Sequence, residues 1–167
     1  MLQRRAQVEE RPPLYTREER VRRDETVWTL VQGVLAPLQF LVFAISLFLV
    51  ARFLITGEGY AAATASVLVK TFMLFAIMVT GSIWEKAVFG RYLFAPAFYW
   101  EDVVSMGVIA LHCAYVAALL IGTEPNVQMA VALAAYASYA LNASQFLLKL
   151  RAARLQAADE IAAEVFR

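Results

Sequence analysis

The chain has 167 residues; 61% of them are hydrophobic, 17% are charged, and the formal net charge is +1. This length and composition favour one domain without a separate soluble catalytic unit, so any chemistry has to take place inside or at the edge of an apolar bundle. The single cysteine, Cys113, excludes an internal disulfide and a cysteine-rich zinc site, and we expect it to pack in the core. The near-neutral charge gives no indication of a nucleic-acid partner, and we expect none.

Residues 1–26 form a charged tail of mixed sign. The tail lacks the short basic and then apolar pattern of a cleaved signal, so we expect it to be retained in the cytoplasm. Its arginines are more typical of a topology signal and of contact with lipid headgroups than of a binding patch.

Four apolar runs follow, and each is long enough to cross a hydrocarbon layer of about 30 Å. They are rich in Ala and Leu and lack the alternation of a membrane β-barrel, so they predict α-helices. The runs cover residues 27–55, 60–88, 102–121 and 127–150. The sequence therefore predicts an all-α integral membrane protein, a four-transmembrane-helix bundle over residues 27–150 with a cytoplasmic helical extension over residues 151–167.

Lys and Arg residues gather on one side of the predicted bundle, in the tail, in the link after the second helix and at the carboxyl end. Only Arg52 lies on the other side. The positive-inside rule therefore places both termini in the cytoplasm, as an even number of spans also requires.

Aromatic residues crowd the predicted cytoplasmic link at residues 89–101, where Tyr99 and Trp100 precede the third helix. One interpretation is the belt of aromatic side chains found at membrane interfaces. The other is a wall for a flat aromatic ligand.

Three carboxylates, Glu85, Glu101 and Asp102, lie at the predicted cytoplasmic helix ends. Buried carboxyl groups near one another can act as acids and bases. Pairing with a nearby cation would instead make them structural. The cations in reach are Lys86, Arg91 and Lys149.

Helical spacing places the polar residues of three spans in stripes, which we expect to face inward. The stripes are Trp28, Gln32, Gln39 and Ser46 on the first helix; Glu101, Ser105, Val108, His112 and Tyr115 on the third; and Ser138, Asn142, Gln145 and Lys149 on the fourth. Hydrogen bonding between helices explains such stripes without catalysis. Their depth also fits a polar cavity open to the cytoplasm.

His112 is the only histidine, which excludes a haem with two histidine ligands and a histidine-based zinc site. It lies about 16 Å deeper than Glu101, and either a hydrogen bond or one axial bond to a metal would satisfy it. Lys70 reaches a similar depth and needs an internal partner, either a carboxylate or a ligand.

Four long segments resemble a known family. They are WTLVQGVLAPLQFLVF at residues 28–43, TGEGYAAATASVLVKT at 56–71, IWEKAVFGRYLFAPAFYWEDVVSM at 83–106 and LNASQFLLKLRAARL at 141–155. Together they resemble the 3-vinyl (bacterio)chlorophyllide hydratases of phototrophic bacteria, over essentially residues 15–155.

The resemblance implies a lyase that adds water to the 3-vinyl group of chlorophyllide a or its bacteriochlorin relative. The product would be a 3-(1-hydroxyethyl) pigment on the route to bacteriochlorophyll a. It also implies a bacterial inner or intracytoplasmic photosynthetic membrane, with lipid, other enzymes of the pathway and a second copy of the chain as candidate partners. We expect no cofactor apart from the magnesium that the substrate carries.

For this chemistry we expect Glu101 to be the acid and Asp102 or Glu85 to orient or deprotonate the water. The substrate-binding candidates are Gln32, Lys70, Lys86, Arg91, Tyr99, Trp100, His112, Asn142, Gln145 and Lys149, with His112 as a candidate axial ligand of the substrate magnesium. Two other classes fit the same residues. A non-catalytic chlorophyllide carrier or assembly factor would use the aromatic wall and His112, whereas an ion or proton transporter would use Lys70 and the carboxylates.

Overall fold

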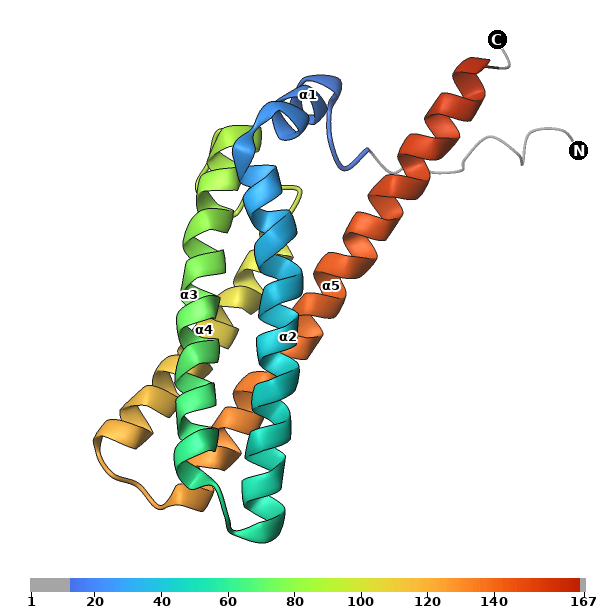
Figure 1. Ribbon diagram of the computed structural model, residues 1–167. Helices are drawn as coiled ribbons and strands as arrows, with labels where there is room; N and C mark the ends of the chain where they lie inside the picture. The colour runs from blue at the N-terminus through green and yellow to red at the C-terminus, as the bar shows by residue number, and fades with distance from the viewer. Residues whose placement is uncertain (1–12, 166–167) are drawn as a thin grey trace, which may run out of the picture.

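The computed structural model describes the backbone of residues 13–165 and the side chains of residues 13–158. Five α-helices account for most of this part of the chain, which contains no strand, so the predicted all-α fold is confirmed (Figure 1). The helices are α1 (Arg17–Glu25), α2 (Val27–Thr56), α3 (Tyr60–Phe89), α4 (Tyr99–Leu120) and α5 (Pro125–Val165).

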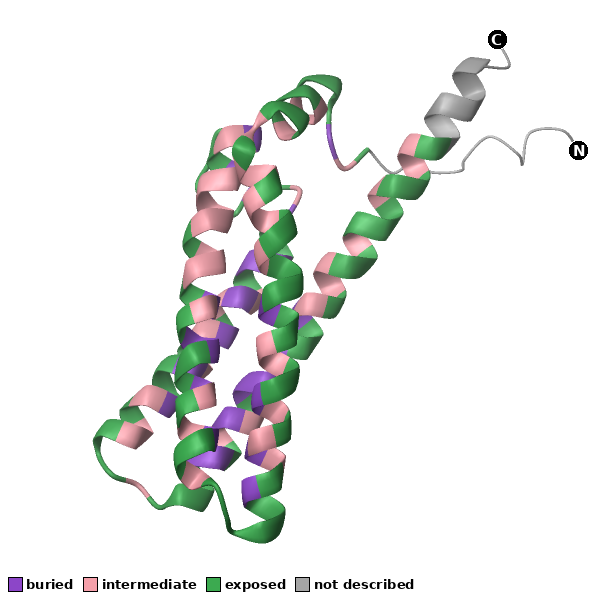
Figure 2. Ribbon diagram, viewed as in Figure 1, coloured by how far each residue is buried: buried purple, intermediate pink, exposed green. Residues whose placement is uncertain are grey.

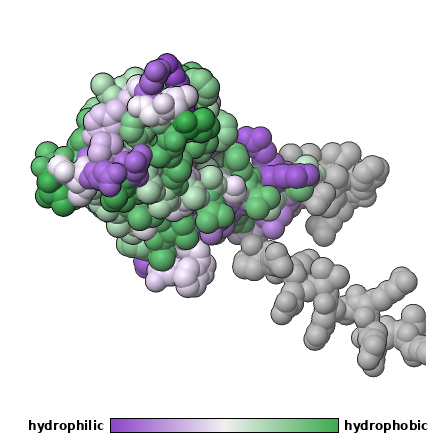
Figure 3. All heavy atoms as spheres, turned by 90° about the horizontal axis from the view of Figure 1, so that it is seen from below, coloured by the Kyte–Doolittle hydropathy of each residue, from purple (hydrophilic) through white to green (hydrophobic). Residues whose placement is uncertain are grey.

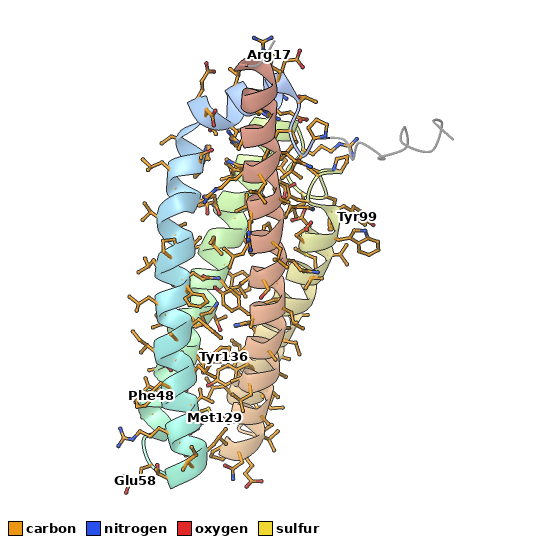
Figure 4. All side chains as sticks on the ribbon, turned by 90° about the vertical axis from the view of Figure 1, so that its right-hand side faces the viewer. Arg17, Phe48, Glu58, Tyr99, Met129 and Tyr136 are labelled. Carbon is orange, nitrogen blue, oxygen red and sulfur yellow. The ribbon has the colours of Figure 1, made fainter. Side chains whose placement is uncertain are left out.

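Helices α2 to α5 are long and apolar enough to be candidate membrane spans. Their outer faces expose large apolar side chains, such as Ile55 at 83% and Phe72 at 72% exposure. Phe48 likewise points away from the bundle in Figure 4, whereas the end of the molecule seen from below in Figure 3 shows hydrophobic residues interrupted by hydrophilic patches. Apolar outer faces on long helices are typical of contact with lipid or with another apolar surface. Cys113 belongs to this outer face, so the prediction that it packs in the core is wrong.

The long helices form two antiparallel hairpins, α2 with α3 and α4 with α5, joined by the loop at residues 90–98 (Figure 1). We call the end with this loop and α1 the loop end, and the opposite end the turn end. At the turn end the chain reverses through Gly57 and Gly122, whose φ angles are 75° and 70°. Glycine adopts this left-handed conformation without the steric cost of a Cβ atom, which allows short turns.

Helix α1 lies in the segment that the sequence treats as a charged tail. A capping box starts it, because Thr16 Oγ1 accepts a hydrogen bond from the Glu19 amide (3.2 Å) and Glu19 Oε2 accepts one from the Thr16 amide (2.7 Å). The helix is fixed to the end of α3 by Arg22, whose Nε donates to the Val88 carbonyl oxygen (2.7 Å). Residues 13–26, which the sequence assigns to the tail, are therefore part of the loop end.

The predicted stripes describe the interior well (Figure 2). The five members on α4, from Glu101 to Tyr115, are all buried. On α2, Gln39 and Ser46 are buried, whereas Trp28 and Gln32 are half-buried. On α5, Asn142 is buried and the other members are half-buried. Helix α5 continues without interruption past residue 150, where the sequence predicts the end of the last span.

Candidate functional site

Three carboxyl groups meet at the loop end. Glu85 lies in the last turns of α3, and Glu101 and Asp102 lie in the first turn of α4. Their residues are only 5%, 7% and 3% exposed, respectively. They come together because α3 and α4 run antiparallel across a nine-residue loop. The first turn of α4 also favours negative charge, since the amino end of a helix carries a partial positive charge.

Glu85 and Asp102 hold the loop between them. Asp102 Oδ2 accepts a hydrogen bond from the Phe94 amide (2.6 Å), and Glu85 Oε2 accepts one from the Ala95 amide (3.3 Å). Phe94 has a φ angle of 59°, which is uncommon for a residue with a side chain. The two carboxyl groups also lie within hydrogen-bonding range of each other. Two carboxylates in contact repel each other, so this geometry fits a pair that shares one proton.

Glu101 has a different partner. Its Oε2 lies 2.5 Å from Lys149 Nζ, so it forms an ion pair that joins α4 to α5. The same ammonium group donates to the carbonyl oxygen of Ala97 and lies 5.0 Å from the centre of the Phe98 ring. Of the three cations that the sequence offers as partners, the structure brings Lys149 to a carboxylate.

The other predicted loop-end residues lie on the surface. Lys86 is exposed and donates from Nζ to the carbonyl oxygen of Gly90 (2.9 Å), and Arg91 is exposed as well. Trp100 and Tyr99 are 69% and 47% exposed, and Tyr99 is seen at the edge of the bundle in Figure 4. These four residues are exposed at the loop end and do not form the inner wall that one interpretation of the sequence predicts.

An inner aromatic cluster does exist, and other residues form it. It consists of Tyr15, Trp84, Phe89, Phe98 and Phe146. Tyr15 stacks on Phe89 at 5.8 Å between ring centres, and Phe98 stacks on Phe146 at the same distance. Because the Phe98 ring also lies against Lys149, the cluster is continuous with the Glu101 ion pair.

Tyr15 was missed by the sequence-based reasoning, although one signal could have found it. It directly precedes the capping residue Thr16, a position where an apolar side chain often packs back against the structure that follows. It is 4% exposed, and the Arg23 guanidinium lies 4.9 Å from its ring centre. Burial raises the pKa of Tyr15 to about 12 from its ordinary value of 10, against the opposing effect of Arg23.

A second polar centre lies deep in the bundle. Lys70 on α3 and His112 on α4 are fully buried, rather than open to the loop end as the sequence predicts. Lys70 Nζ lies 3.6 Å from the centre of the Tyr139 ring and has no hydrogen-bond partner among the described residues. His112 Nδ1 donates to the Val108 carbonyl oxygen (2.8 Å), which leaves Nε2 as an unpartnered nitrogen within the same part of the chain.

The remaining predicted residues join helices to one another. Gln32 Nε2 donates to Thr80 Oγ1 (2.7 Å), linking α2 to α3. Asn142 Nδ2 donates to Ser105 Oγ (2.7 Å), linking α5 to α4. The oxygens Asn142 Oδ1 and Gln145 Oε1 are buried without a partner among the described side chains. Across residues 13–158, no group of three or more His, Cys, Asp or Glu side chains is placed to hold a metal ion.

These features define an all-helical protein with four candidate membrane spans and a buried set of carboxyl groups at one end. The sequence model of one family, 2-vinyl bacteriochlorophyllide hydratase, matches residues 15–152, and the chain belongs to this family. This result confirms the resemblance seen in the sequence.

Two curated relatives carry the same name. A 2-vinyl bacteriochlorophyllide hydratase of Rhodobacter capsulatus is 69% identical over 150 residues, which cover 90% of this chain and 88% of the relative. One of Cereibacter sphaeroides is 72% identical over 142 residues, which cover 85% of this chain and 89% of the relative. No solved structure matches the chain.

Proposed function

We propose that the chain is a membrane-bound hydratase that adds water to the vinyl group of a bacteriochlorophyllide or chlorophyllide, giving a hydroxyethyl substituent. The 2-vinyl group of the family name and the 3-vinyl group of the resemblance are the same substituent in two numbering systems. Family membership supports the reaction, and the buried contact between Glu85 and Asp102 is the observation that supports a chemical role for this site. The exposed apolar faces of α2 to α5 support a location in the membrane of a phototrophic bacterium.

The carboxyl pair supplies both proton transfers in this mechanism. The pair first gives its shared proton to the terminal vinyl carbon, and the electron pair of the double bond forms the new C–H bond. The positive charge then lies on the carbon attached to the macrocycle, which delocalises it. Water adds to that carbon, and the resulting oxonium returns one proton to the pair. Atoms and charge balance over the cycle, and the reaction needs no oxidant or reductant.

Glu101 takes a different role here from the one expected from the sequence. Its carboxyl group is already engaged by Lys149 in an ion pair, so it is less available for proton transfer than the Glu85 and Asp102 pair. The ion pair as a whole carries no net charge, and it fixes the start of α4 and the end of the loop to α5. We therefore assign proton transfer to Glu85 and Asp102, and positioning of the loop end to Glu101 and Lys149.

The rest of the substrate would lie along the helices. The loop end would face the cytoplasm, as the distribution of Lys and Arg predicts. His112 Nε2 has the free lone pair that an axial ligand of the substrate magnesium requires. Other enzymes of the pathway and a second copy of the chain stay candidate partners.

The test is conversion by the purified full-length protein in detergent or lipid nanodiscs, without added cofactor. The protein is incubated with chlorophyllide a or the corresponding bacteriochlorophyllide in oxygen-labelled water, and the pigment is analysed by mass spectrometry. We expect the pigment to gain one water molecule, to lose its vinyl group and to carry the label in the new hydroxyl group. Pigment that binds and stays unchanged would contradict the proposal and favour a carrier.

A further inference from the structure

Lys70 is a buried cation for which the described protein supplies no anion. Its Nζ has no hydrogen-bond partner in that part of the chain, and the nearest described feature is the face of the Tyr139 ring at 3.6 Å. The carboxyl pair is far away, because Glu85 lies fifteen residues further along α3, or about 22 Å along the helix axis. Lys149, by contrast, already has Glu101 as its counterion.

An unpaired ammonium group in an apolar bundle is energetically costly. The contact with an aromatic face repays only part of the lost hydration, because the attraction of a ring for a cation is weaker than an ion pair. Replacement by an apolar side chain of similar length would remove this cost altogether. A lysine at this depth is therefore best explained by a ligand that brings the missing negative charge.

The surroundings of Lys70 indicate what kind of ligand this is. Leu74, Val108 and Tyr139 form a buried apolar cluster beside it. Nearby on α4, His112 presents an unpartnered Nε2, which can accept a hydrogen bond or bind a metal. These apolar surroundings suit an apolar molecule that carries a single anionic group. A small hydrated anion is a poorer fit, because it would give up its hydration shell and gain only one ammonium group as a partner.

We propose that Lys70 binds the carboxylate of the tetrapyrrole substrate, an inference that rests on the proposed function. The carboxylate replaces the Tyr139 ring as the partner of Nζ, and the vinyl group at another edge of the macrocycle reaches Glu85 and Asp102. The separation of about 22 Å along α3 is shortened by the reach of both side chains, which leaves a span suited to one substituted macrocycle lying along the helices. The exposed cations Lys86 and Arg91 have no part in this pairing.

The test compares the free carboxylic acid of the pigment with its methyl ester, which has the same macrocycle but no negative charge. Binding to the full-length protein in nanodiscs is followed by the absorption shift of the pigment, so that the result does not depend on turnover. The proteins are wild type, Lys70→Met, Lys70→Arg and Lys86→Met. Arg52→Met serves as the matched control, since Arg52 is an exposed cation near the turn end. Circular dichroism and size-exclusion chromatography show whether each variant is folded.

We expect the wild type to bind the acid at least about tenfold more tightly than the ester. Lys70→Met should bind both pigments equally, Lys70→Arg should keep part of the preference, and Arg52→Met should keep all of it. The proposal is wrong if the wild type shows no preference, or if Lys70→Met keeps it. A preference lost in Lys86→Met and kept in Lys70→Met would place the carboxylate at the surface and also overturn the proposal. Failure of hydration with an intact acid preference would refute the hydratase function alone.

Discussion

The loop-end carboxyl groups and the deep Lys70–His112 centre are both buried and polar, but they differ in how their charges are satisfied. Glu85, Asp102 and Glu101 each have a partner within the protein, from backbone amides, from one another or from Lys149. Lys70 Nζ and His112 Nε2 have no hydrogen-bond partner among the described residues, although Lys70 Nζ lies over the Tyr139 ring. The polar groups of the first region satisfy one another, which suits proton transfer, whereas the described residues supply no anion for the second region.

The largest effect is expected from variants that remove one carboxyl group of the Glu85 and Asp102 pair. Glu85→Gln and Asp102→Asn keep the size of the side chain but remove the acid, so kcat should fall by about 10²–10⁴-fold, the usual contribution of a positioned acid or base. Pigment affinity should change much less, because the proton transfer that is lost acts in the transition state and not in the binding of the pigment. Turnover by mass spectrometry and binding by absorption measure the two separately. Near-normal turnover in both folded variants would exclude the pair as the proton source.

Stability should respond with opposite signs in the two regions. Lys149→Met leaves the buried Glu101 carboxylate without its counterion, so we expect a loss of about 1–3 kcal/mol and a lower Tm. Lys70→Met removes a buried charge that has no counterion, so Tm should stay the same or rise. The double variant Glu101→Gln with Lys149→Met should recover much of the loss. A large fall in Tm for Lys70→Met would show that Lys70 has a structural partner after all.

A smaller effect is expected from the hydrogen bonds that surround the deep centre. Tyr136 Oη and Ser46 Oγ lie 2.5 Å apart and join α5 to α2, and Figure 4 shows Tyr136 pointing into the bundle. Tyr136→Phe removes this bond and should cost about 1 kcal/mol of stability. A thermal melt checks the loss, with Ser46→Ala as a second probe of the same bond. If the two changes add in the double variant, the residues do not act as a pair.

The smallest effect concerns Tyr15 at the loop end. The folded pKa of about 12 lies above the ordinary value of 10, so both states keep the proton below pH 10 and the packing of Tyr15 is unaffected there. Above pH 10, Tyr15 ionises readily only when its side chain has left the aromatic cluster. The packing of Tyr15 in this cluster therefore weakens progressively as the pH approaches 12. Melts between pH 8 and 11 should therefore show the wild type losing stability relative to Tyr15→Phe on the alkaline side. Parallel curves would show that Tyr15 does not control the docking of this segment.

The elements were predictable because their signals are local. Apolar runs of membrane length predict α2 to α5, and the spacing of Glu101, Ser105 and His112 predicts the buried face of α4. The pairings were not predictable from sequence, because Glu101 had several cations in reach and its contact with Lys149 depends on how α4 packs on α5. The same holds for Glu85 and Asp102, since contact between two carboxyl groups follows from the tertiary fold alone.

Helix α5 has a mechanical consequence that reaches beyond the bundle. Its 41 residues form one uninterrupted rod of about 60 Å, roughly twice the thickness of a hydrocarbon layer. This helix contains both Tyr139, which contacts Lys70, and Lys149, which pairs with Glu101, and it continues beyond the bundle in Figure 1. A small tilt at Tyr139 is therefore enlarged with distance along the rod. A ligand at the deep centre that tilts α5 would therefore move the far end of the helix more than it moves Tyr139.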